Sequence, residues 1–249
     1  MTDHFQPISI FKKDYYKKFL AFPTVKESEI EKRMVELRKL GVTHISFTGP
    51  LQIDKCNILG KGYVGMVVLA KKSGKIVALK IRRTDSPRKN MSDEAKLLKI
   101  ANEINIGPRF IKNSKNFLIM EFIDGEKIID WAKKSKSKQL CPVITNVLRE
   151  CYLLDNVGLD HGELSTIDKH VIVGKNRNTI IDFESSSTKR VSSNVSAATQ
   201  AIFIGTGLAK TIRKKIQVPR RDKIIRLVRN YKKLRTEKSF DDLVQGLKL

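Results

Sequence analysis

A glycine triplet followed by a lysine is the first feature of this chain that suits phosphoryl chemistry. Gly60, Gly62 and Gly65 lie between two segments rich in aliphatic residues, and Lys80 follows fifteen residues after Gly65. A loop without side chains can fold over phosphates and offer its N–H groups to them. Lys80 stands between two aliphatic residues, so a strand there places its ammonium on the face opposite the apolar one. The triplet alone also fits an ordinary hairpin, but a lysine on the next strand favours a nucleoside triphosphate site.

Taken in order, several segments resemble the ATP site of the protein-kinase superfamily. They are the glycine-rich loop at 60–67, the strand at 77–80, the loop at 161–165 and the aspartate segment at 181–183. The sequence His-Gly-Glu-Leu-Ser at 161–165 is similar to the His-Gly-Asp-Leu-Ser/Thr loop of RIO-type kinases and of the small kinase in the tRNA-modifying KEOPS complex. The chain therefore resembles an atypical, archaeal-style serine/threonine protein kinase.

The resemblance implies three catalytic residues. Lys80 would bind the α- and β-phosphates of ATP and would be held by a glutamate of the following helix. Glu94 is the first candidate for that glutamate, and Glu103 is the second. Glu163 stands where the family has its catalytic aspartate, and a carboxylate there would accept or orient the proton of the attacking hydroxyl.

The cofactors implied by the resemblance are ATP and Mg²⁺. The glycine-rich loop would cover the phosphates, and the segment that joins the two lobes would meet the adenine edge with its backbone. The expected ATP-binding residues are Gly60, Lys61, Gly62, Tyr63, Val64, Gly65, Val67, Lys80, Met120, Glu121 and Ile123.

The resemblance also implies metal ligands. Asp182 matches the aspartate of the Asp-Phe-Gly motif and would be the principal Mg²⁺ ligand. The family places an asparagine ligand five residues after the catalytic carboxylate, which corresponds to Asp168, whereas alignment on the following strand puts His170 at that place. Asp168 suits Mg²⁺ better because hard cations prefer oxygen ligands. Asp168 and His170 both remain candidates.

The expected elements are β-rich first and α-rich afterwards. Alternating and β-branched patterns predict strands at 66–70, 76–81, 117–122, 171–173 and 179–182. Helical spacing of apolar residues predicts helices at 24–40, 93–101, 128–134, 142–156, 197–216 and 221–234. This order predicts an α+β, two-lobed protein-kinase-like fold, with a β-rich N-lobe containing one helix. Only 67 residues follow Asp182, so the helical C-lobe is expected to be shortened.

We expect three parts along the chain. Residues 1–50 would form an N-terminal helical extension, residues 51–123 the N-lobe, and residues 124–249 a reduced C-lobe that ends in basic helices. The extension carries no motif that assigns it a function.

Composition bears on the cellular location and the partners of this protein. The three cysteines form no Cys-x-x-Cys pair, which argues against a zinc site and predicts a reducing, cytoplasmic location. No apolar run is long enough to cross a membrane, so no membrane partner is expected. The formal net charge is +23, and residues 210–238 hold thirteen Lys and Arg against two acids. Such a field attracts polyanions, although a merely solvated basic surface explains it equally well.

Three functions are consistent with these observations. The leading hypothesis is an ATP-dependent atypical serine/threonine protein kinase that phosphorylates a protein, with the chain itself among the candidate substrates. A second is a kinase for a small hydroxyl-bearing molecule, which usually requires an acidic pocket. A third is an ATP-binding switch or ATPase associated with RNA, a tRNA-modifying complex or the ribosome through the basic C-terminal helices.

Overall fold

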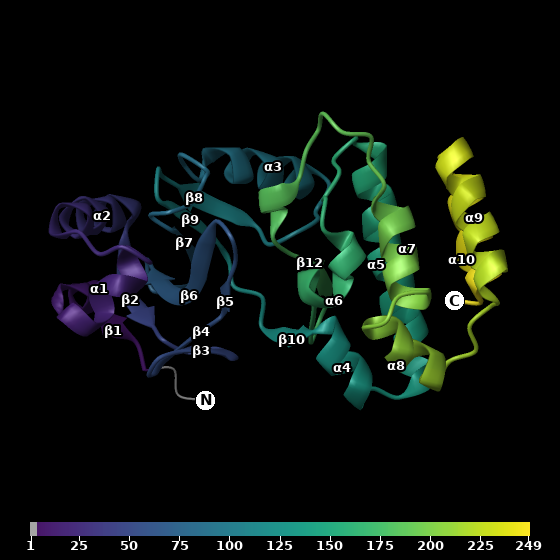
Figure 1. Ribbon diagram of the computed structural model, residues 1–249, viewed down its shortest axis with the longest axis horizontal. Coiled ribbons are helices and arrows are strands. Elements are labelled where there is room, and N and C mark those ends of the chain that lie inside the picture. The colour runs from purple at the N-terminus through teal and green to yellow at the C-terminus, as the bar shows by residue number, and fades with distance from the viewer. Residues whose placement is uncertain (1–3) are drawn as a thin grey trace. The chain divides into compact units, whose positions relative to one another are not determined.

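The computed structural model of the protein describes residues 4–249, which divide into two compact units (Figure 1). The first unit runs to Lys99 and also takes in Pro108–Phe122, and the second comprises Ile100–Gly107 and Ile123–Leu249. The first unit is built on an antiparallel sheet, and the second is mostly helical. The predicted α+β class, with a β-rich N-terminal lobe and a helical C-terminal lobe, is thus confirmed.

The first unit is organised by a seven-stranded sheet of order β1-β2-β6-β7-β9-β8, in which β5 also pairs with β6. All of these pairs are antiparallel. The strands are β1 (Gln6–Pro7), β2 (Val42–Ser46), β5 (Gly60–Lys61), β6 (Gly65–Lys72), β7 (Lys75–Arg82), β8 (Phe110–Asn113) and β9 (Phe117–Glu121), and β3 (Leu51–Ile53) with β4 (Cys56–Ile58) forms a separate hairpin. Because β1 and β2 come from the N-terminal segment, that segment continues the sheet.

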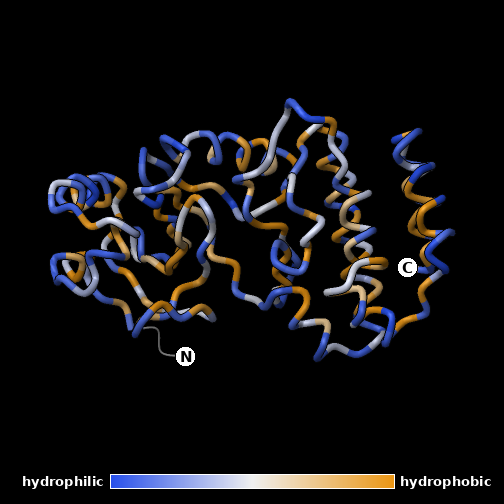
Figure 2. Tube along the Cα trace, viewed as in Figure 1, coloured by the Kyte–Doolittle hydropathy of each residue, from blue (hydrophilic) through white to orange (hydrophobic). Residues whose placement is uncertain are grey.

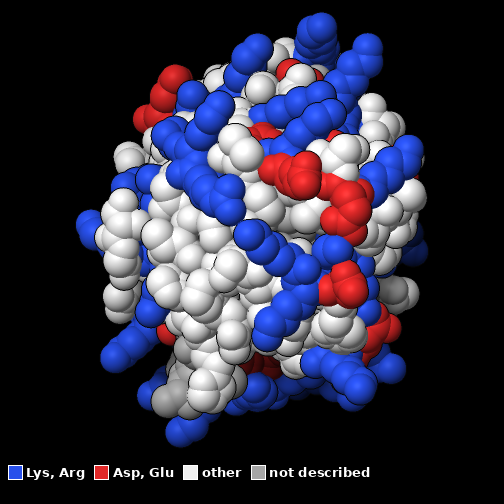
Figure 3. Space-filling view, turned by 90° about the vertical axis from the view of Figure 1, so that its left-hand side faces the viewer, with Lys and Arg blue, Asp and Glu red and all other residues white. Residues whose placement is uncertain are grey.

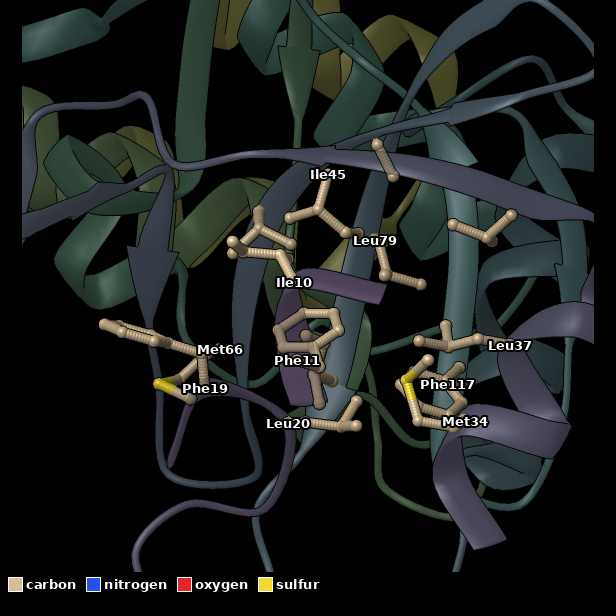
Figure 4. Packing of buried hydrophobic residues seen from close by; sticks show 14 of the residues in the cluster. Ile10, Phe11, Phe19, Leu20, Met34, Leu37, Ile45, Met66, Leu79 and Phe117 are labelled. Atoms are coloured by element: carbon tan, nitrogen blue, oxygen red, sulfur yellow. The ribbon is translucent and has the colours of Figure 1, made fainter. Parts of the chain in front are cut away.

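The helices of the N-terminal segment share one hydrophobic core with the sheet. They are η1 (Ile8–Lys12), α1 (Asp14–Leu20) and α2 (Glu27–Leu40), while α3 (Ser92–Glu103) follows β7. Figure 4 shows side chains from η1, α1 and α2 packed against strand residues, among them Phe11, Phe19, Leu37, Ile45 and Leu79. All five are almost fully buried, so the segment before residue 50 contributes directly to the core of this unit.

A buried arginine attaches α2 to the sheet. Arg33 is fully buried, and its Nε lies 2.7 Å from Oε1 of Glu29. Its Nη1 donates to the carbonyl oxygens of Leu20 and Arg82 at 2.7 and 2.6 Å, and its Nη2 donates to Oδ1 of Asn116 at 3.2 Å. A buried charge costs a great deal of free energy unless it is paired and hydrogen-bonded. These bonds therefore fix the position of α2 on the sheet.

The second unit contains a small sheet and most of the helices. The antiparallel strands β10 (Gly125–Lys127), β11 (Val171–Gly174) and β12 (Asn178–Ile180) form the sheet. The helices are α4 (Ile128–Lys134), α5 (Ser137–Asn156), η2 (Leu164–Thr166), α6 (Ile167–His170), η3 (Phe183–Ser185), α7 (Asn194–Phe203), α8 (Leu208–Lys215), α9 (Arg221–Leu234) and α10 (Glu237–Leu247). No helix in residues 4–249 is both long and apolar enough to cross a membrane.

Asp155 at the end of α5 connects three helices of this unit. Its Oδ1 accepts bonds from the backbone and side-chain nitrogens of Asn194, both at 2.9 Å, and its Oδ2 accepts from the Val195 N–H at 3.2 Å and the Tyr231 hydroxyl at 3.0 Å. Burial and the neighbouring carboxylate raise the pKa of Tyr231 far above its usual range. The hydroxyl therefore remains a donor, and it holds α9 against α5 and α7.

The apolar stripe of α9 packs inside the unit, and its charged side chains stay outside. Hydrophobic and hydrophilic residues alternate along α9 (Figure 2), and Ile224, Val228 and Tyr231 are buried. Tyr152 of α5 stacks on Phe240 of α10 with ring centroids 4.7 Å apart. The stripe is thus part of the fold.

The helix expected at 24–40 begins at Glu27 as α2, the one expected at 93–101 is α3, Ser92–Glu103, and two further helices differ more. The helix expected at 197–216 is divided into α7 and α8, and the break contains Gly205 and Gly207, residues that weaken a helix. The helix expected from Pro142 starts earlier, at Ser137, where the Gln139 side chain accepts the Lys136 N–H at 2.8 Å. Capping at this end moves the start of the helix upstream of the proline.

Candidate active site

One row of residues crosses the sheet of the first unit at the glycine-rich loop. Gly60 on β5 pairs with Val67 on β6, and Val67 pairs with Lys80 on β7. Directly opposite residues of antiparallel strands share a face of the sheet. Leu79 and Ile81 point to the other face and are buried in the core. The Lys80 side chain therefore leaves β7 on the face opposite this core, in line with the loop glycine.

Gly60 and Gly65 of the loop differ in whether the surrounding structure leaves room for a side chain. A Cβ at Gly65 would lie 2.7 Å from the carbonyl oxygen of Ile81 and 3.2 Å from Cγ of Lys80, so β6 and β7 require a glycine there. A Cβ at Gly60 would meet no atom within 4 Å. The Gly62 N–H donates to the Gly65 carbonyl at 2.8 Å and closes the loop. Gly65 is needed by the fold itself, whereas Gly60 leaves open space beside the backbone.

The other residues of the loop have distinct surroundings. Val64 is buried, and Tyr63 is 73% exposed. The Lys61 ammonium lies 4.2 Å from the centroid of the Phe22 ring, a cation–π contact with the N-terminal segment. The N-terminal segment therefore borders the predicted nucleotide loop.

Lys80 forms a buried ion pair with the first-turn glutamate of α3. Its Nζ lies 2.8 Å from Oε1 of Glu94. Glu103, the other candidate, is exposed at the opposite end of α3. The structure thus brings together Lys80 and Glu94, and it places Glu103 away from this pair.

The predicted adenine-contacting residues lie where the chain leaves the first unit. Met120 pairs with Ala78 of β7 near the end of β9. Glu121 exchanges bonds with Arg109: its Oε2 accepts the Arg109 N–H at 3.0 Å, and its own N–H donates to the Arg109 carbonyl at 2.8 Å. Ile123 opens the next part of the chain and belongs to the second unit.

Glu163, in the second unit, is held from two sides. Its Oε2 lies 3.0 Å from Nε2 of His170. Its Oε1 accepts a hydrogen bond from the Ser185 hydroxyl. The carboxylate predicted to act as a base is therefore oriented by an imidazole and accepts a hydrogen bond from a hydroxyl.

Asp182 completes a cluster with these residues. The ligand atoms of Glu163, His170 and Asp182 all lie within 4.8 Å of one another. Asp182 has φ +71° and ψ 74°, in the left-handed region that non-glycine residues rarely occupy. Such backbone strain persists only where the surrounding structure imposes it, and it is concentrated at functional sites.

Of the two candidates for a second metal ligand, the structure brings only His170 into this cluster. Asp168 is turned toward Gly207, at the start of α8, where its Oδ2 lies 3.1 Å from the position that a glycine Cβ would take. A carboxylate at a helix N-terminus is stabilised by the helix dipole. Asp168 thus has a structural contact of its own.

Two carboxylates and one imidazole fit the divalent cation that the kinase resemblance implies. Carboxylate oxygens suit Mg²⁺ and Mn²⁺, and an imidazole nitrogen shifts preference toward transition metals. Asp182 and His170 would hold the ion, and Glu163 would lie beside it.

A buried histidine, His161, packs against the His170 ring of this cluster. His161 is fully buried, its Nε2 lies 3.0 Å from the carbonyl oxygen of Ile181, and its ring makes edge contacts with those of His170 and Phe183. Burial, with the adjacent His170 as a second cause, lowers the pKa of His161 to about 4. The ring is therefore neutral near pH 7, and its Nε2 donates to the carbonyl oxygen of Ile181, the residue before Asp182.

The backbone of Ser185 and a positive φ require a glycine at 162, and Arg190 packs beside it. Its φ is +87°, and a Cβ there would lie 2.5 Å from Nη2 of Arg190 and 2.7 Å from the Ser185 carbonyl oxygen. Arg190 donates from Nη2 to that carbonyl at 2.6 Å and from Nε to Oδ2 of Asp160 at 2.9 Å. The guanidinium thus connects Asp160, directly before the loop at 161–165, to Ser185 in the segment after Asp182.

Sequence analysis did not single out Ser185 or Arg190. Ser185 lies within a run of three serines and a threonine that has no distinguishing pattern. Arg190 is one of many basic residues. Their roles become visible only from the contacts that they make with Glu163 and around Gly162.

Sequence comparisons with known proteins give two matches. A sequence model of a family described as "RIO domain" matches residues 70–195. This segment contains Lys80, Glu94 and the cluster of Glu163, His170 and Asp182, while the glycine-rich loop precedes it. The chain is also 32% identical over 117 residues to an uncharacterized protein of Methanocaldococcus jannaschii, an alignment that covers 46% of this chain and 100% of the relative.

Proposed function

Because the chain belongs to the RIO family of atypical protein kinases and ATPases, we propose that it is an ATP-dependent serine/threonine protein kinase that transfers the γ-phosphate to a protein hydroxyl. The single observation that carries this proposal is the buried ion pair between Lys80 and Glu94, at 2.8 Å. Protein kinases need this pair in place for phosphoryl transfer. In this chain it lies on the strand row that also contains Gly60 of the loop.

Each residue then has a defined task. Lys80, oriented by Glu94, binds phosphate oxygens, and the loop glycines let backbone N–H groups approach them. Asp182 and His170 would hold a divalent cation, which would neutralise the charge that develops on the phosphates. Glu163 accepts the proton of the attacking hydroxyl, while His170 fixes the orientation of its carboxylate.

The test combines transfer with binding. Purified protein is incubated with γ-labelled ATP, Mg²⁺ or Mn²⁺ and a generic basic protein, and label is followed on both proteins. We expect Glu163→Gln to lower turnover by about 10²- to 10⁴-fold, the usual contribution of a general base. Its ATP-induced thermal shift should stay near that of the wild type, because the substitution keeps size and hydrogen bonding.

Two further variants complete this test. Lys80→Ala should lose transfer and the ATP-induced shift together, since bound ligand raises apparent stability. Glu163→Asp restores the residue of the family and should keep activity. Transfer at the wild-type rate by Glu163→Gln would show that Glu163 is structural and would favour an ATPase switch.

A specific observation also supports an RNA partner. On α9, Arg226, Arg229, Lys232 and Lys233 are exposed, and none of them forms an ion pair within residues 4–249. Lys and Arg also predominate over acids on the face of the first unit shown in Figure 3. Unpaired cations of one sign attract a polyanion. We therefore propose that α9 binds RNA, as expected for a kinase or switch that works on a ribonucleoprotein.

A further inference from the structure

The hydroxyl of Ser185 contacts the carboxylate that is proposed as the kinase base. Its Oγ donates a hydrogen bond to Oε1 of Glu163. The other oxygen of that carboxylate is engaged by His170 at 3.0 Å, so the contact is made by a carboxylate with a fixed orientation. A nucleophile and its base within hydrogen-bond reach, with the base held by a third group, is the arrangement of an activated nucleophile.

Ser185 is also held by its backbone. Its carbonyl oxygen accepts a bond from Nη2 of Arg190 at 2.6 Å, and Arg190 is anchored in turn by Asp160. Ser185 ends the short helix η3, which begins directly after Asp182. The serine is thus fixed three residues from the proposed metal ligand and in contact with the proposed base. Neighbouring hydroxyls are bonded elsewhere: Ser186 donates to the His161 carbonyl.

We propose that Ser185 is a self-phosphorylation site, modified within its own chain. This inference rests on the proposed kinase function. Oγ of Ser185 attacks the γ-phosphorus of a bound nucleoside triphosphate, the new Oγ–P bond forms, and the bond from phosphorus to the β–γ bridging oxygen breaks. The nucleoside diphosphate leaves with that oxygen, and the proton of Ser185 passes to Oε1 of Glu163. The products are phosphoserine, the diphosphate and one proton.

Each chain should phosphorylate its own Ser185 only once. Once Ser185 carries a phosphoryl group, its oxygens and the Glu163 carboxylate repel each other, and Glu163 no longer contacts a hydroxyl. Arg190, already bonded to the same residue, is the cation available to the new phosphate. The phosphorylated form should therefore lose its contact between Ser185 and Glu163 and become inactive toward added substrate.

The test follows the position of the phosphate on the full chain. Wild type, Ser185→Ala, Ser185→Thr and the neighbouring control Ser187→Ala are treated with phosphatase and then with ATP and Mn²⁺. Intact mass and peptide mapping locate the phosphate, and ADP release is measured in parallel. We expect one phosphate at residue 185 in wild type, Ser185→Thr and Ser187→Ala, at a rate independent of protein concentration, and its loss in Ser185→Ala.

A binding measurement separates loss of the acceptor from loss of the site. The thermal shift produced by a non-hydrolysable ATP analogue should be the same in Ser185→Ala as in wild type. ADP release or labelling of added protein with residue 185 unmodified would overturn this inference and leave the proposed kinase intact. A labelling rate that rises with protein concentration would overturn modification within one chain. No ADP and no label on any protein would overturn both proposals.

Discussion

The ammonium of Lys80 and the carboxylate of Glu94 form an ion pair 2.8 Å long, with only 4% and 3% of the two side chains exposed. Two strand neighbours of Lys80 anchor β7 in the core, and α3 buries Ala95 and Leu98 beside Glu94. Packing on both elements therefore sets the distance between the charges. Burying two charges costs free energy that their attraction only partly offsets. The pair is better explained by the proposed phosphate site than by a contribution to stability.

A double-mutant cycle on Lys80 and Glu94 separates these two contributions. Glu94→Leu leaves the ammonium buried without its carboxylate and should lower the free energy of unfolding by about 3 to 5 kcal/mol. Adding Lys80→Met removes the buried ammonium as well, so the double variant should recover much of that loss. Neither variant should show an ATP-induced thermal shift. Urea unfolding measures the first quantity, and additive losses in the double variant would show that the two side chains are not coupled.

The metal preference of the chain should depend on His170. We expect wild type to bind Mn²⁺ in preference to Mg²⁺, because an imidazole accepts transition metals more readily than Mg²⁺. His170→Asn should weaken Mn²⁺ binding by about ten- to a hundredfold, the range seen when a metal site loses a supporting group. Asp168→Asn is the matched control, since its carboxylate faces Gly207. Titrating each variant with Mn²⁺ and following the thermal shift distinguishes the two residues. Weaker Mn²⁺ binding in Asp168→Asn alone would show that Asp168, and not His170, is the metal ligand.

Much of the first unit could be predicted from the sequence because its information is local. Strand alternation placed Lys80 opposite the core face, and the spacing of Glu94 put it one turn into the next helix. β1 has only two residues, Gln6–Pro7, and so shows no periodicity. Its membership of the sheet follows from pairing with β2, which no local pattern encodes.

The second unit was harder to predict because its site depends on contacts between distant residues. Ser185 meets Glu163 across 22 positions, and Arg190 meets Asp160 across 30. A run of serines contains nothing that distinguishes the one beside the base. The choice between Asp168 and His170 depended on where a four-residue helix, α6, directs each side chain. Spacing left both residues open and ligand chemistry favoured Asp168, but the fold turns the Asp168 side chain toward Gly207 at the start of α8.

Stability should depend on pH through Glu150. Burial raises the pKa of this carboxyl from 4.5 to about 7. The folded chain then binds more protons than the unfolded chain between these values, so the free energy of unfolding falls as pH rises through this window, by about 3 kcal/mol in total.

In Glu150→Gln the side chain at 150 cannot ionise, so the fall in the free energy of unfolding with rising pH is removed. The free energy of unfolding of the variant, relative to that of the wild type, should rise by about 3 kcal/mol between about pH 4 and about pH 8. Urea unfolding at both pH values checks this. His161, whose pKa is lowered to about 4, has the opposite pH dependence, but it is present in both proteins and cancels from the difference. A difference that is constant with pH would show that Glu150 is ionised in the folded chain.

RNA binding should be lost selectively when the exposed cations of α9 are removed. Each phosphate contact releases condensed counterions, so replacing Arg226, Arg229, Lys232 and Lys233 by Ala should flatten the slope of log affinity against log salt by up to about 3 for single-stranded RNA. The four side chains are exposed and Ala favours helix, so α9 should remain folded.

A charge-matched control replaces the exposed lysines at 133, 134, 136 and 138, two of which are already paired with acids. Filter binding across a salt series compares the proteins. Equal weakening by both sets would show a response to net charge alone, and unchanged binding in the α9 variant would remove RNA as its partner.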